Sequence, residues 1–277
     1  VISELFKALG ILVSSSTSHF NEEQIASIIK LFEETFNGTI ETVYTSPNVL
    51  SQDILNSLFF SLRMFILTLG HNIQTNNIAQ HFTSFLNAHF IKSKSSTIKA
   101  YIALTYGIMF FVAPALKEIG TTSRDWCFKL LSKNNVYVNN IIISTLNYII
   151  YGDTTLFTEQ QILTLKKQCE NIIQKKDSMD SFIVGTATTM WCTIITKYDI
   201  APPDDDLNIV LSLLSLPVDD DDIPFAAQFI CIAMQKWPAL VNNHIQRVAV
   251  NVFASGEWCL RIVPKEVMTA LAQVISS

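Results

Sequence analysis

The feature that most constrains the fold is a recurring pattern of an apolar segment, a polar turn and a second apolar segment. Its clearest copy occupies residues 207–277, where an apolar segment stops at Leu216 and Pro217, four aspartates follow, and another apolar segment begins at once. Nearly every long segment places apolar residues at the spacing of one helix face, and none alternates as a strand would. The sequence therefore predicts an all-α chain built from helical hairpins.

The residues between the apolar segments carry signals for helix starts and ends. Asn21 is expected to cap one helix and Asp180 another, and Thr158 with Gln161 has the spacing of a capping box. The helix after Asn21 is expected to carry one apolar stripe, formed by Ile25, Ile28, Ile29, Phe32 and Phe36. Gly70 is expected to end a helix. Further starts are expected at Asn76 or Asn77 and at Ser123.

The first helices of successive hairpins then begin near residues 22, 76, 123, 159, 205 and 239. The spacing of roughly 35 to 55 residues is the range of HEAT and armadillo units. One such hairpin cannot bury its apolar face alone, so about six of them are expected to stack into an α-solenoid, a superhelical array. No long Gly/Ser linker interrupts the series, which predicts a single continuous domain over residues 1–277. The chain starts at Val1 in a helical pattern and is expected to be part of a longer protein.

The composition, 49% hydrophobic and 16% charged, supplies enough apolar material for a sizeable core. Residues 100–116 contain no charged residue, and the length of this run is at the lower limit for a membrane-spanning helix. Pro114 near the end of this run, Lys99 and Lys117 on either side, and the lack of a clustered positive loop favour a buried solenoid helix. No membrane insertion is expected.

The net charge of −5 argues against binding to a phosphate backbone, which needs a clustered basic face, and suits basic partners instead. No direct nucleic-acid binding is expected. The five cysteines are scattered within apolar helical patterns and lack the spacing of a zinc site, so they are expected to be buried in a reduced compartment. They are Cys127, Cys169, Cys192, Cys231 and Cys259.

Catalytic and cofactor motifs are missing from the sequence. The five histidines form no metal-ligand pair, and the chain holds no nucleophile elbow, Walker loop or dinucleotide-binding glycine motif. Its eight glycines never cluster into a phosphate cradle. We therefore expect no enzyme activity, no catalytic residue, no metal and no cofactor.

Two acidic clusters stand out, residues 204–206 and 219–222. Carboxylates at a helix start interact with the helix dipole for roughly 0.3 to 1 kcal/mol, but capping needs only one or two of them. The excess aspartates either are solvated caps or hold a Lys/Arg-rich partner. Trp237 and Trp258 lie nearby in the sequence and either belong to a hairpin core or stack on a basic side chain.

Several stretches of the chain resemble a known protein family. The run LNIVLSLLSLPVDDDDIPFAAQFICIAMQKWP is similar to the repeat near the C-terminus of importin-beta superfamily nuclear transport receptors, and so is VNVFASGEWCLRIVPKEVMTALAQVIS. Asp180 and the helix after it resemble an inner helix of those receptors, which often opens with Asp-Asn, although Ser181 stands here in place of the Asn. The branch that imports ribosomal proteins and histones looks closest.

The resemblance implies the C-terminal HEAT-repeat part of a karyopherin that shuttles between cytoplasm and nucleus. Basic cargo with nuclear-localisation signals would bind on the inner face without catalysis, and the GTPase Ran would bind mainly through missing N-terminal repeats. Contacts with nucleoporins stay open. The cargo-binding candidates are Asp180, Asp219, Asp220, Asp221, Asp222 and Trp237. The alternative is a constitutive HEAT-repeat scaffold subunit of a phosphatase or a trafficking complex.

Overall fold

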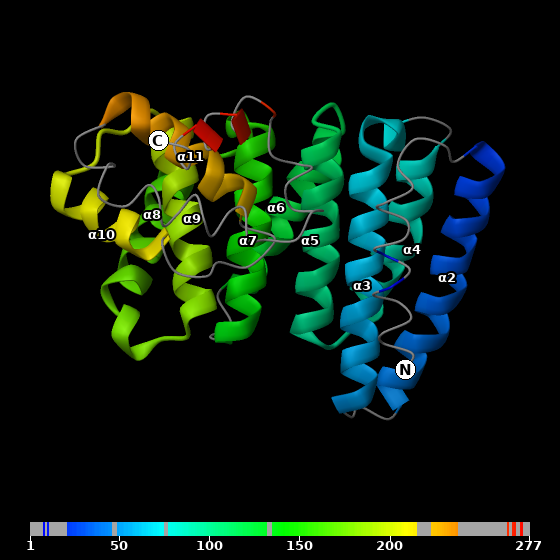
Figure 1. Ribbon diagram of the computed structural model, residues 1–277. Coiled ribbons are helices and arrows are strands. Elements are labelled where there is room, and N and C mark those ends of the chain that lie inside the picture. The colour runs from blue at the N-terminus through cyan, green and yellow to red at the C-terminus, as the bar shows by residue number, and fades with distance from the viewer. Residues whose placement is uncertain are drawn as a thin grey trace. The chain divides into compact units, whose positions relative to one another are not determined.

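The structure, a computed structural model, describes residues 21–45, 49–74, 77–131, 135–214 and 223–237 and a few single positions near the two ends of the chain. Within these residues the chain forms ten α-helices and no strand (Figure 1). This confirms the predicted all-α fold of helical hairpins. The chain divides into two compact units, Val1–Lys133 and Asn134–Ser277. The single continuous domain and the superhelical course stay predictions.

The first unit is built from helical hairpins. Its inner helices, α3 and α5, pack on each other, and each also packs on the helix that precedes it in the chain, α2 or α4. Helix α5 packs most extensively on α6. The elements, in chain order, are α2 (Glu22–Thr45), α3 (Val49–Leu69), the 3₁₀ helix η1 (Gly70–Gln74), α4 (Ile78–Lys92), α5 (Ser96–Val112) and α6 (Lys117–Leu131).

Aromatic side chains fill the core between α2, α3 and α4. The Phe36 ring meets the edge of the Phe59 ring at 4.9 Å between centroids, and Phe32 stacks on Phe65 at 5.8 Å. All four side chains are buried. The stripe predicted for the helix after Asn21 therefore faces the core at Phe32 and Phe36, whereas its first positions are partly exposed.

Helices α5 and α6 approach each other closely because small residues line their contact. Gly120 of α6 lies against the Phe110 ring, and the Ser123 hydroxyl donates a 2.7 Å hydrogen bond to the carbonyl oxygen of Ala103. The predicted helix start at Ser123 is therefore wrong. The helix begins earlier, at Lys117, and the polar Ser123 is buried inside it because its hydroxyl bonds to the neighbouring helix.

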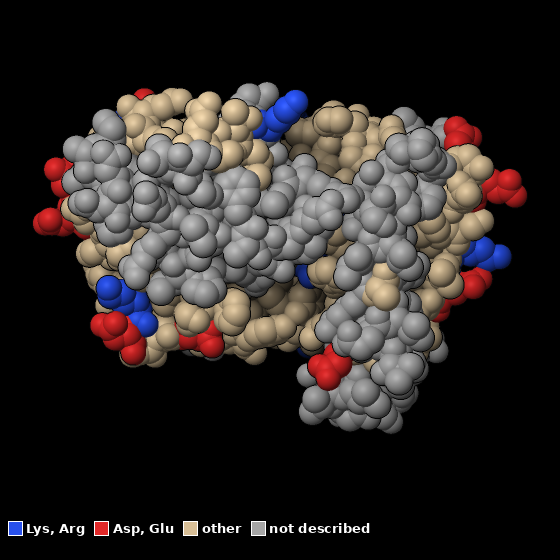
Figure 2. All heavy atoms as spheres, in the orientation of Figure 1, with Lys and Arg blue, Asp and Glu red and all other residues tan. Residues whose placement is uncertain are grey.

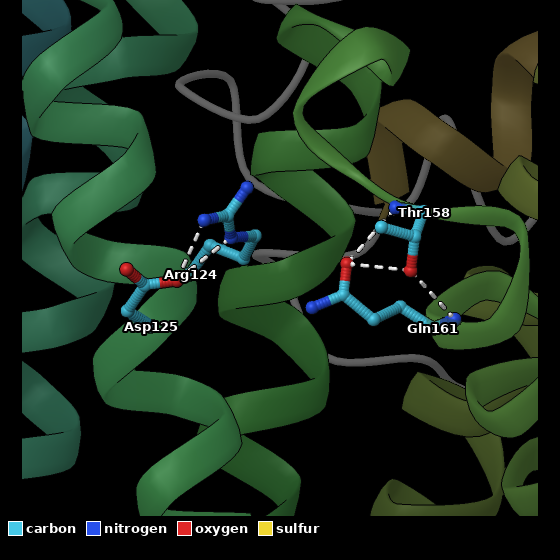
Figure 3. Close-up of polar contacts among 4 residues, drawn as sticks. All are labelled: Arg124, Asp125, Thr158 and Gln161. Atoms are coloured by element: carbon cyan, nitrogen blue, oxygen red, sulfur yellow. Dashed lines mark hydrogen bonds and ion pairs between the residues drawn. The ribbon is translucent and has the colours of Figure 1, made fainter.

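Several predicted caps are present. Asn21 accepts a hydrogen bond from the Gln24 backbone N–H at 2.9 Å, and Thr158 with Gln161 forms the reciprocal capping box at the start of α8 (Figure 3). Asn77 occupies the position before α4, but its side chain makes no capping hydrogen bond. Its backbone lies in the left-handed region at φ 57°, a conformation that asparagine tolerates. The helix start predicted at Asn76 or Asn77 is confirmed at Asn77, without a hydrogen bond from its side chain.

Helix α9 is the centre of the second unit and packs on α7, α8, α10 and α11. Its Trp191, Met190, Cys192 and Ile194 side chains are buried, as expected for a helix surrounded by others. The elements are α7 (Val136–Gly152), η2 (Thr154–Leu156), α8 (Glu159–Gln174), η3 (Lys176–Ser178), α9 (Ser181–Lys197), α10 (Asp204–Leu214) and α11 (Ile223–Lys236).

The apolar run at residues 100–116 lies mostly in α5, whose residues from Ala100 to Phe110 are all buried in the fold. In the described part of the chain, a different segment, Asp53–Gln74, has the length and apolar composition of a membrane-crossing helix, and 56% of its apolar window is buried within the fold. Burial of this kind is also what a core helix shows. The absence of membrane insertion stays a prediction.

Candidate functional site

Asp180 is exposed and caps helix α9. Its carboxylate oxygen Oδ1 accepts a 2.9 Å hydrogen bond from the backbone N–H of Phe182, which confirms the predicted helix start. The capping role accounts for one oxygen of the side chain. The negative charge also faces solvent, so Asp180 can still meet a basic partner.

Helices α7 and α9 share their length, a capping residue and an aromatic second residue. Each is 17 residues long and follows a capping residue, Asn135 for α7 and Asp180 for α9. The second residue of each helix is a half-exposed aromatic side chain, Tyr137 at 51% and Phe182 at 52% of full exposure. Neither residue was predicted from the sequence as part of a site, although both stand at the same distance from a helix cap.

The starts of α7 and α9 lie at the same end of the second unit. Their other ends meet, because the Tyr198 hydroxyl after α9 donates a 3.0 Å hydrogen bond to the Thr154 carbonyl oxygen after α7. There the Lys197 ammonium also lies 3.8 Å from the Tyr151 ring centroid. Because α7 and α9 pack on each other, are equally long and end together, their starts lie at the same end of the unit. The axes of packed helices are about 8–10 Å apart at their closest approach.

We call Val136, Tyr137, Asp180 and Phe182 the inner edge. Its three apolar members are all about half exposed. The turn that leads into α9 adds the exposed side chains of Lys175, Lys176 and Asp177, so the surroundings carry both signs of charge. The inner edge therefore offers aromatic faces next to a carboxylate, an arrangement that can hold the stem and the charge of a lysine or an arginine.

Trp237 lies away from the inner edge. It directly follows α11, whose last residue, Lys236, forms an ion pair with Asp199 just after α9. Trp237 is therefore near the end of α9 that is opposite to Asp180, about 25 Å away along a helix of that length. The structure does not bring these two candidates together.

Helix α11 begins against the second half of α7. The Phe225 ring lies 4.9 Å from the Tyr148 ring and 5.4 Å from the Tyr151 ring, between centroids. The start of α11 is thus remote from the inner edge. The candidates that precede it, Asp219, Asp220, Asp221 and Asp222, lie outside the described residues.

Among the described histidines and cysteines, His89, Cys127, Cys169 and Cys192 are buried, Cys231 is partly buried, and His71 and His81 are exposed. His89 is buried and its Nε2 lies 3.0 Å from the Asn37 side-chain oxygen. Burial raises the pKa of the Cys169 thiol to about 12 and also raises that of Cys192, which makes both poor nucleophiles. No group of three His, Cys, Asp or Glu side chains that could hold a metal occurs among the described residues.

Charged side chains are spread over the surface. On the face drawn in Figure 2, the described Lys and Arg residues are scattered and do not gather in one patch. Several acidic residues lie in first turns, namely Glu22 and Glu23 of α2, Glu118 of α6, Glu159 of α8 and Asp204, Asp205 and Asp206 of α10. A carboxylate in this position interacts favourably with the helix dipole.

No protein-family model matches the chain, and comparisons with curated proteins and with solved structures found no match. The resemblance to the importin-beta superfamily therefore stays a prediction. The fold defines the structural class, an all-α protein of helical hairpins. What the protein binds has to be inferred from its surface.

Proposed function

We propose that this chain is a non-catalytic helical-repeat protein that binds basic segments of other proteins along the inner edge. The more specific proposal is a nuclear import receptor fragment. In that role it would shuttle between cytoplasm and nucleus, carry cargo with basic nuclear-localisation signals, and release it through Ran bound mainly to N-terminal repeats. The import role rests on the sequence resemblance, and the binding role rests on the surface described above.

The observation that carries the binding proposal is the pair Tyr137 and Phe182 beside Asp180. Half-exposed aromatic side chains at equivalent positions of two packed helices form a repeated contact for an extended segment. A cation over an exposed aromatic ring contributes about 0.5–1 kcal/mol, so the two rings together contribute about 1–2 kcal/mol. Such weak contacts give useful affinity when several repeats hold one cargo at the same time. No bond is made or broken in this mechanism.

The test is binding of a lysine- and arginine-rich localisation peptide to the full chain, measured by fluorescence anisotropy. Replacing Tyr137 and Phe182 together by Ala is expected to weaken binding about 5- to 30-fold. Leu163→Ala is the matched control, because Leu163 of α8 is 49% exposed but lies outside the inner edge. Equal affinities of the double variant and the control would refute the proposal.

Asp180→Asn tests the charge separately. Asparagine caps a helix about as well as aspartate, so the variant should keep α9 intact and remove only the charge. Binding is expected to weaken at low salt, with a difference that fades as salt screens the carboxylate. Glu159→Gln is the control, since Glu159 begins α8 at the opposite end of the α8–α9 hairpin.

The import role is tested in the full-length protein. A basic partner that GTP-bound Ran releases would support a transport receptor. A stoichiometric partner that is insensitive to GTP-bound Ran would instead favour the constitutive scaffold subunit. Pull-down of nucleoporin fragments in the same experiment would show whether this region also contacts the nuclear pore.

A further inference from the structure

A groove with an apolar floor lies between α8, α9 and α10, and none of its lining residues belongs to the inner edge. Its volume is about 270 Å³, and its floor is formed by Ile173, Trp191 and Val210, which are almost fully buried. Ile209 of α10 lines it with 41% of its side chain exposed. A large aliphatic side chain exposed beside a buried apolar floor is a place where a partner could cover apolar surface.

The rim of this groove is mostly acidic. Glu170 and Asp206 line it together with one cation, Lys176. Asp204 and Asp205, both exposed, directly precede Asp206 in the first turn of α10. Because residues three and four apart share a helix face, Asp205 and Asp206 lie on the same side of α10 as Ile209.

The structure holds the groove in a defined shape. The indole N–H of Trp191 donates a 3.4 Å hydrogen bond to Glu170 Oε1, and Glu170 also pairs with Lys166 one turn earlier in α8. The Glu170 charge is thereby partly compensated inside the protein. The aspartates of α10 therefore supply most of the negative charge that a partner would meet.

We propose that this groove, which we call the α8–α10 groove, binds a short protein segment in which an aliphatic residue is followed by lysines or arginines. The aliphatic side chain covers Ile209 and enters above Val210 and Ile173, and the basic side chains meet the aspartates of α10. The volume fits one or two apolar side chains rather than a drug-sized ligand, for which pockets usually exceed about 300 Å³. The groove is a second docking surface, formed by residues other than those of the inner edge.

The charge complementarity favours this occupant over a purely apolar one. Helix dipole interaction needs only one or two carboxylates, and three consecutive aspartates repel one another unless a cation approaches. An apolar partner would leave that repulsion in place, and a basic segment without an aliphatic residue would leave Ile209 exposed. Only a segment with both parts satisfies both features.

The experiment uses the full chain and a fluorescent synthetic peptide in which one leucine is followed by a run of lysines. Ile209→Ser is expected to weaken its binding about fivefold to tenfold. Asp206→Asn is expected to weaken it severalfold at low salt and less at high salt. Leu163→Ser is the control, because Leu163 is a similarly exposed aliphatic residue outside the groove, and this variant is expected to bind like the unaltered protein.

Peptide variants separate the two parts of the proposal. A peptide with serine in place of the leucine should bind the unaltered protein and the Ile209→Ser variant with the same affinity. A peptide with glutamine in place of the lysines should bind weakly to every form of the protein. The proposal would be overturned if the serine peptide bound the unaltered protein as tightly as the leucine peptide does, or if the glutamine peptide bound tightly. Loss of binding on Phe182→Ala but not on Ile209→Ser would assign the peptide to the inner edge and overturn it as well.

Discussion

Gly120 offers the sharpest test of how α5 and α6 pack. A Cβ atom at this position would lie 2.7 Å from Cγ of Phe110 and 2.8 and 2.9 Å from the two Cδ atoms. Carbon atoms prefer about 3.5–4.0 Å, and the Phe110 ring is fully buried and cannot swing away. Overpacking of this kind costs about 1–3 kcal/mol, against a gain in helix propensity of up to about 1 kcal/mol. Gly120→Ala is therefore expected to destabilise the protein by about 1–2 kcal/mol.

Gly38→Ala is the matched control in the same unit, because Gly38 lies in α2 and no atom comes within 4 Å of an added Cβ. This change is expected to stabilise by about 0.5–1 kcal/mol. With about 2–4 °C per kcal/mol for chains of this size, thermal unfolding should show Gly120→Ala lower by roughly 2–8 °C and Gly38→Ala higher by roughly 1–4 °C. If Gly120→Ala raises the melting temperature as the control does, the close approach of the two helices is wrong.

Three further predictions concern single interactions. Ser123→Ala removes the hydrogen bond to Ala103 and should lower the free energy of unfolding by about 1 kcal/mol in urea titration. Thr158→Ala removes the cap of α8 and should cost about 1 kcal/mol in the same assay. The raised pKa of Cys169, about 12 in the folded protein against 9.0 ordinarily, makes its contribution to stability complete below pH 9. That contribution is lost as the pH rises towards 12, so Cys169→Ala should flatten the fall in melting temperature over this window.

The parts of the fold that were predictable are those fixed by local chemistry. The capping box at Thr158, the caps at Asn21 and Asp180, and the apolar stripe at Phe32 and Phe36 each depend on residues within one or two turns. Such features depend on a short stretch of sequence, so they can be predicted without the tertiary structure. The all-α class followed from them, whereas the count of about six hairpins stays a prediction, because the start expected near residue 239 lies outside the described residues.

The wrong helix start arose where a polar residue has two possible partners. Serine caps a helix or bonds to a neighbouring helix, and the sequence around Ser123 does not distinguish the two. The structure gives it the second role, because Ala103 of α5 lies within reach. Asn77 shows the same ambiguity, since asparagine both caps helices and tolerates a left-handed backbone, and here only the backbone property is used.

The candidate site was only partly readable for a related reason. Asp180 attracts attention because it is charged, and its helix start is confirmed. Whether Trp237 lies beside it depends on the direction of α11, which long-range contacts such as Phe225 on Tyr151 decide. Exposed aromatic residues such as Tyr137 and Phe182 look like core residues in a sequence rich in apolar side chains.

A comparison of α5, α7 and α9 shows why the exposure of Tyr137 and Phe182 calls for an explanation beyond folding. Helices α5, α7 and α9 are all 17 residues long and are capped by Ser95, Asn135 and Asp180. The second helical residue is Thr97 in α5, but Tyr137 in α7 and Phe182 in α9. Because a threonine serves at this position in α5, the hairpin architecture does not require an aromatic side chain there. Tyr137 and Phe182 each leave about half of an aromatic side chain exposed, and binding a partner is the reason that we propose for this exposure.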